Sequence, residues 1–151
     1  MQRFCAAFVF LVIISGNPHP KQKWVVLPRA QAEVVDRLCS RSALPTVEGS
    51  WEPTTADVTA MEKRLSEVPK LQGTTVESGV PIRDPRRYYR QYVGVIVSGQ
   101  KLIYINAFCE EHPPSSWQQK LVDDCDGGCN WGVLYDPTTA EFSHFGVNGI
   151  A

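Results

Sequence analysis

The stretch from Tyr88 to Cys109 constrains the fold more than any other part of this sequence. Two runs rich in β-branched and aromatic residues flank Ser98-Gly99-Gln100-Lys101, where glycine adopts a positive φ without steric cost. This pattern predicts a β-hairpin. Both faces of its strands are largely apolar, which is typical of a central pair of strands with helices on one side and partial cover on the other.

Two segments before this hairpin have the hydrophobic spacing of helices. Residues 32–41 place Val34, Val35 and Leu38 at helical spacing, and residues 54–68 begin with a capping hydroxyl and carry an apolar stripe. A second hairpin is expected from residues 131–135 and 141–147. The predicted fold is a single α+β domain over residues 31–151, with two N-terminal helices packed on an antiparallel sheet of about four strands.

The N-terminus resembles an export signal. Arg3 precedes an uncharged apolar run over residues 4–14, which as a helix would span about 16 Å, about half the core of a bilayer. We therefore expect a signal peptide over residues 1–16, with cleavage as late as residue 32 also open, and no stable membrane anchor after its removal. Residues 17–30 are expected to form a loose leader, although residues 24–27 could dock as a short strand. The expected location is periplasmic or secreted.

Export would remove Cys5 and leave four cysteines in an oxidising compartment, where two disulfides are expected. Three pairings are possible, and we favour those of Cys109 with Cys125 and of Cys39 with Cys129. The same region offers a competing zinc set of three cysteines and one histidine, namely Cys109, His112, Cys125 and Cys129. Because oxidation favours disulfides, no metal and no cofactor are expected.

Charge also limits the partners of this chain. With 15 basic and 16 acidic residues, its net charge of −1 provides no global field to attract nucleic acid or an anionic membrane. Locally, four arginines alternate with tyrosines over residues 83–90, which indicates either a solvated strand entry or a patch for an acidic protein or glycan. The expected contact surface is built from residue types that dominate interface hot spots: Arg86, Arg87, Tyr88, Arg90 and Trp131.

The C-terminal half carries several short motifs, namely Asn106-Ala107-Phe108, Asp126-Gly127-Gly128, Trp131-Gly132-Val133, Tyr135-Asp136 and Asn148-Gly149. On these motifs, residues 88–151 resemble a group of small exported bacterial proteins of unknown function. The resemblance implies a small exported α+β domain and brings no catalytic residues.

No phosphate-binding glycine loop, nucleophile elbow or zinc-protease motif is present in the sequence. We therefore expect an exported, disulfide-stapled, non-enzymatic binding or inhibitory module for a protein partner. One alternative is a small envelope hydrolase that uses His112 with the nearby carboxylates of Glu110 and Glu111. Another is a structural envelope protein.

Overall fold

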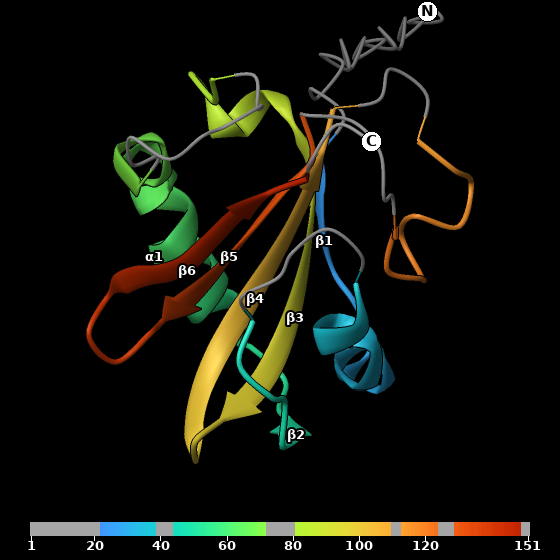
Figure 1. The fold of residues 1–151 in the computed structure, drawn as a ribbon, viewed down its shortest axis with the longest axis vertical. Helices are drawn as coiled ribbons and strands as arrows, with labels where there is room; N and C mark the ends of the chain where they lie inside the picture. Colours follow the sequence, from blue (N-terminus) through green and yellow to red (C-terminus); the bar gives the residue numbers. More distant parts are fainter. Residues whose placement is uncertain (1–21, 39–43, 72–80, 110–112, 124–128, 149–151) are drawn as a thin grey trace, which may run out of the picture.

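The computed structural model describes residues 22–38, 44–71, 81–109, 113–123 and 129–148, which form a six-stranded mixed sheet with helical segments on both faces (Figure 1). In the labels used here, η marks a 3₁₀ helix. The elements in chain order are β1 (Trp24–Val26), η1 (Arg29–Arg37), β2 (Gly49–Ser50), α1 (Thr55–Arg64), η2 (Leu65–Leu71), η3 (Pro85–Arg87), β3 (Tyr89–Val97), β4 (Gln100–Phe108), β5 (Trp131–Asp136) and β6 (Glu141–Val147).

The two predicted hairpins are confirmed. β3 and β4 pair antiparallel from Tyr89 opposite Phe108 to the closing turn, where Ser98 and Gly99 have φ of 49° and 72°. Positive φ at both central residues matches the right-handed twist of the strands. β5 and β6 form the second antiparallel pair, and Asp136 Oδ1 accepts a hydrogen bond from the Thr138 amide at 2.7 Å in its turn.

The predicted arrangement of the sheet and helices was wrong. The sheet has six strands in the order β1-β3-β4-β5-β6, with β2 also paired to β3, and β1 runs parallel to β3. The helices are not N-terminal to the sheet, because β1 precedes η1 and β2 precedes α1. β1 and β2 have three and two residues, which is too short to show the alternation of apolar and polar residues that identifies a strand, so the sequence did not reveal either one. Residues Trp24–Val26 form a strand, as the alternative for residues 24–27 allowed, and are not part of a loose leader.

The helical segments also differ from the expected α-helices. Residues Arg29–Arg37 form a 3₁₀ helix, which ends where Leu38 turns extended with ψ of 127°. The later helix begins with the expected cap: Thr54 Oγ1 accepts a hydrogen bond from the Asp57 amide, and the Asp57 carboxylate accepts one from the Thr54 amide at 2.8 Å. Its α-helical part ends at Arg64, and η2 continues it as a 3₁₀ helix that includes Pro69, which lacks an amide hydrogen.

Two apolar cores lie on opposite faces of the sheet. α1 and η2 cover one face, where Met61, Leu65 and Val68 pack with Tyr92 and Trp131. η1 covers the other face through Ala32 and Val35, which pack with alternate residues of β3, among them Val93 and Val95. The expectation that both faces of the first hairpin are buried is confirmed, and helices occupy both sides rather than one.

Buried amides fasten residues 113–123 to the η1 face. Gln91 Oε1 accepts hydrogen bonds from Asn106 Nδ2 and from the Val122 amide, both at 2.8 Å, and Gln91 Nε2 donates to the Lys120 carbonyl at 2.7 Å. Trp117 packs edge-on against the ring of Tyr89. The segment from Ser115 forms hydrogen-bonded turns.

One glycine in β3 permits the chain to pass closely over the strand. A Cβ atom at Gly94 would lie 2.2 Å from the Trp51 carbonyl oxygen, so no other residue fits there without a shift of backbone. The Trp51 amide donates to the Gly94 carbonyl at 3.2 Å, and its indole nitrogen donates to the Leu102 carbonyl at 2.8 Å. This crossing places the start of α1 beside the first strand of the hairpin.

Candidate binding surface

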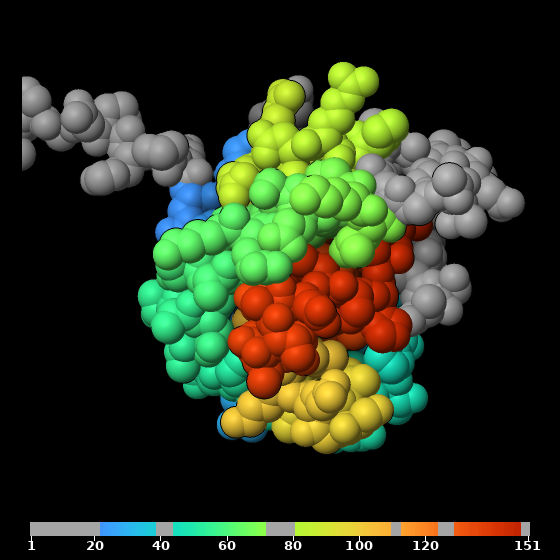
Figure 2. Space-filling model, turned by 90° about the vertical axis from the view of Figure 1, so that its left-hand side faces the viewer, coloured from blue at the N-terminus to red at the C-terminus, as the bar shows by residue number. Residues whose placement is uncertain are grey.

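The arginine-rich entry to β3 forms a rigid turn. Pro85 begins η3 with its φ already restricted, and Asp84 caps the turn by accepting a hydrogen bond from the Arg86 amide at 3.1 Å. Figure 2 shows the yellow-green segment that contains η3 projecting above α1. Arg86 and Arg87 are therefore held on an exposed turn before the chain enters the sheet at Tyr89.

The structure divides the five predicted contact residues into two groups. Arg86 and Arg87 are exposed, and Tyr88 is half-buried with its ring packed edge-on against Trp131 at 5.7 Å. Arg90 is only 3% exposed and Trp131 is fully buried. Of these five residues, the first three therefore lie at the surface around η3, while the other two lie beneath it.

Arg90 acts as an internal anchor for η3. Its Nε donates to Glu62 Oε1 at 3.2 Å and to the Tyr92 hydroxyl at 2.9 Å, and its Nη1 donates to the carbonyls of Pro85 and Tyr88 at 3.1 and 2.7 Å. The Tyr92 hydroxyl in turn donates to Glu62. Burial lowers the pKa of the Arg90 guanidinium, and the Glu62 carboxylate beside it opposes that shift.

Arg86 ties η3 to α1 from the outside. Its Nη2 donates to the Glu62 carbonyl at 3.0 Å, near the end of α1, and this carbonyl also accepts a hydrogen bond from the Leu65 amide. Exposure alone therefore does not make Arg86 available to a partner, because its guanidinium already has a structural role.

An open hollow of about 410 Å³ lies between η3 and the end of β4. Its lining residues are Pro81, Arg83, Asp84, Arg87, Tyr88 and Cys109. Arg83 and Arg87 are exposed, and neither side chain has a carboxylate partner within the described parts of the chain. Asp84, the acidic residue of the lining, already serves as the cap of η3.

Lys23 adds a further cation beside η3. Its Nζ donates to the Arg87 carbonyl at 3.1 Å and lies 5.1 Å from the centroid of the Tyr89 ring. Sequence reasoning missed Lys23, because 64 residues separate it from Arg87. Arg83 was also omitted from the predicted surface, although it belongs to the same basic run and could have been included from the sequence alone. We call Lys23, Arg83, Arg86, Arg87 and Tyr88 the η3 surface.

A disulfide closes one side of the hollow. Cys109 is bonded to Cys129, with their Cα atoms 5.9 Å apart, so the bond links the end of β4 to the residues before β5. Both favoured pairings, of Cys109 with Cys125 and of Cys39 with Cys129, were wrong. Cys39 and Cys125 lie outside the described residues. Two of the three sulfurs that the zinc alternative required, those of Cys109 and Cys129, are here bonded to each other.

The remaining chemical candidates are His144 and the residues of the hydrolase alternative. His112, Glu110 and Glu111 of the hydrolase alternative lie outside the described residues. His144 is exposed on β6 with its Nδ1 3.1 Å from Ser143 Oγ. In the described segments, no group of three or more histidine, cysteine or acidic side chains is arranged to hold a metal, and no helix is long and apolar enough to cross a membrane.

Comparisons with protein-family models, with curated proteins and with solved structures find no match to this chain.

Proposed function

We propose that this chain is an exported, disulfide-stapled, non-enzymatic binding or inhibitory module whose η3 surface receives an acidic segment of a protein partner. The apolar run behind Arg3 supports export, and the bond between Cys109 and Cys129 is of the kind that persists in oxidising compartments.

One observation carries the proposal. The guanidinium groups of Arg83 and Arg87 border a single open hollow without carboxylate partners in the described segments, although the whole chain is slightly acidic. Guanidinium groups bind carboxylates through paired hydrogen bonds, and the half-buried ring of Tyr88 supplies an apolar floor with a polar tip. A cationic, aromatic hollow on a rigid turn is suited to an acidic side chain presented by another protein.

The test compares recovery of a partner by the wild-type chain and by two charge-reversal variants. Arg87→Glu alters the hollow, and Arg37→Glu makes the same change of charge at an exposed position on η1. Each purified chain, with its disulfide intact, is immobilised and incubated with native extract, and bound proteins are quantified at low and high salt.

We expect Arg87→Glu to reduce recovery of the specific partner at least tenfold, whereas Arg37→Glu leaves it unchanged. Salt should weaken the wild-type interaction, because the charges are exposed. Equal recovery by all three chains would refute the η3 surface as the contact.

A further inference from the structure

Within the described part of the chain, no strand pairs with the outer edge of β1, although Gln22 Nε2 donates a hydrogen bond to the Trp24 carbonyl at 3.1 Å. β1 is the terminal strand of the sheet, next to β3. The Arg90 amide donates to the Lys23 carbonyl at 2.8 Å and the Leu27 amide donates to the Tyr92 carbonyl at 2.9 Å. Since hydrogen-bonding residues alternate along a parallel strand, the backbone groups of Trp24 and Val26 face away from β3.

The opposite edge of the sheet carries features that discourage pairing. β6 exposes Glu141, Ser143 and His144, and His144 has φ of 51°. The pairing of β5 with β6 is also irregular. Charged side chains and irregular backbone protect edge strands from added strands. β1, in contrast, is apolar and half-buried throughout and has no positive φ.

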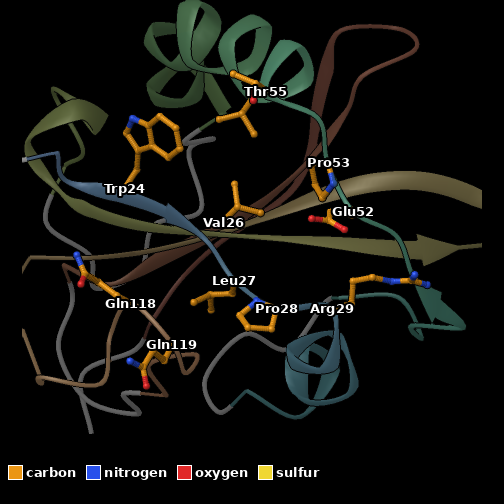
Figure 3. A pocket seen from close by; sticks show the side chains of 11 residues that line it. Trp24, Val26, Leu27, Pro28, Arg29, Glu52, Pro53, Thr55, Gln118 and Gln119 are labelled. Carbon is orange, nitrogen blue, oxygen red and sulfur yellow. The ribbon is translucent and has the colours of Figure 1, made fainter.

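A groove of about 540 Å³ adjoins the unprotected edge. Figure 3 shows β1 passing between the start of α1, marked by Pro53 and Thr55, and the turn that carries Gln118 and Gln119. A strand added to β1 would project alternate side chains towards these two walls. The first wall carries the apolar side chains of Trp24, Val26 and Val58 together with Glu52, and the second offers exposed amides. Arg29 also lines the groove, beyond Leu27, and its guanidinium is already hydrogen-bonded to Ser50.

Lys23 connects this groove to the η3 surface. It immediately precedes β1, and its Nζ is hydrogen-bonded to the Arg87 carbonyl. The edge therefore begins where the cations gather, and it continues along apolar side chains. This distribution of charge favours one occupant: a segment that is acidic at one end and alternately apolar beyond it.

We propose that the partner of the η3 surface presents an extended peptide that adds as a strand to the outer edge of β1. Its acidic residues lie at the Lys23 end, and its apolar side chains lie beside Trp24 and Val26. Backbone hydrogen bonds to Val26 provide affinity, and the groove provides sequence preference. This inference rests on the proposed function and adds the conformation and the chemical pattern of the partner.

The experiment uses a display library of short peptides with aspartate and glutamate at one end and variable residues beyond them. The library is selected on the immobilised, oxidised full chain. Enriched peptides are then measured against Val26→Pro and its matched control Val26→Thr. Proline removes the outward amide hydrogen without removing a bond to β3, whereas threonine keeps that hydrogen and favours a strand. Circular dichroism checks that both variants are folded.

We expect alternating apolar residues in the enriched peptides, binding retained by Val26→Thr, and at least tenfold weaker binding by Val26→Pro. If Val26→Pro fails to fold, N-methylation along the wild-type peptide gives the same test, because only alternate positions should abolish binding. Absence of enriched peptides, or uniform effects of N-methylation, would overturn strand addition. Self-association that Val26→Pro abolishes and enriched peptides cannot displace would assign the edge to a second copy and overturn it too.

Arg87→Glu separates this inference from the proposed function. Loss of binding with Val26→Pro but not with Arg87→Glu would retain the strand edge and refute the acidic contact at η3. Loss with Arg87→Glu but not with Val26→Pro or N-methylation would retain the η3 surface and refute strand addition.

Discussion

Replacement of Glu62 by glutamine tests the internal anchor beneath the η3 surface. The Arg90 side chain is 4% exposed and that of Glu62 is 19% exposed, so their ion pair is largely shielded from water. Breaking a buried pair by removal of one charge typically costs about 3–5 kcal/mol, because the remaining charge stays buried. Glutamine retains one acceptor oxygen for Arg90 and Tyr92. We therefore expect the free energy of unfolding to fall by about 3 kcal/mol, at the lower end of this range.

Glu67→Gln is the matched control for this variant. It removes the same charge from the pair between Arg64 and Glu67, whose nitrogen and oxygen are 3.0 Å apart and whose side chains are 42% and 38% exposed. Exposed pairs contribute at most about 1 kcal/mol. The expected loss for Glu67→Gln is therefore below about 1 kcal/mol and disappears at high salt.

The assay is equilibrium unfolding in urea under oxidising conditions, followed by circular dichroism at low and high salt. Glu62→Gln should lose stability at both salt concentrations, with an unchanged dependence of free energy on urea. If Glu62→Gln and Glu67→Gln lose equal free energy, or if salt cancels both losses, the anchor is not an electrostatically shielded pair.

Three further perturbations test the packing, the disulfide and the pH dependence of stability. Gly94→Ala forces a Cβ to 2.2 Å from a carbonyl oxygen and should cost about 3 kcal/mol or more in urea unfolding, while Gly146→Ala, with open space around its Cβ, should cost under about 1 kcal/mol. Reduction of the bond between Cys109 and Cys129, which are 20 residues apart, should lower the free energy of unfolding by about 3 kcal/mol. The control is the double variant Cys109→Ser, Cys129→Ser, which lacks this bond and should not show this loss on reduction. Burial raises the pKa of the Tyr88 hydroxyl, so the folded state holds this proton more tightly than the unfolded chain does. The resulting contribution to the free energy of unfolding is complete below the unfolded pKa of about 10 and is lost as pH rises through the folded pKa. Tyr88→Phe should remove that part of the decline in stability at high pH, as measured by urea unfolding.

The features that the sequence predicted correctly depend on residues close together in the chain. The turn at Ser98 and Gly99 needs positive φ within two residues, and the cap of α1 needs Thr54 and Asp57 three residues apart. Local steric and hydrogen-bonding rules are sufficient for both. The alternation along β3 likewise predicted that both of its faces are buried.

The strands that the sequence did not predict correctly depend on pairing between residues far apart in the chain. β1 and β2 are defined by their registers with β3, as in the pairing of Val25 with Gln91 and of Ser50 with Val95. Neither strand is long enough to carry a period of its own. The 3₁₀ geometry of η1 was also inaccessible, because the apolar residues that suggested an α-helix, such as Val35, are buried equally well by a tighter helix against β3.

The candidate surface shows why composition could not distinguish the arginines of residues 83–90. Strand alternation places Arg90 on the same face as Tyr92, where Glu62 is available only because α1 packs there. The sequence shows that four arginines are present. Only the structure shows that Arg90 donates to the Glu62 carboxylate and Arg86 to the Glu62 carbonyl, so both guanidinium groups already have partners within the chain. A loss of partner binding in Arg90→Ala would therefore report a displaced η3, not a lost contact, unless the free energy of unfolding were unchanged. Arg83 and Arg87 are the positions where weaker binding without loss of stability identifies the interface itself.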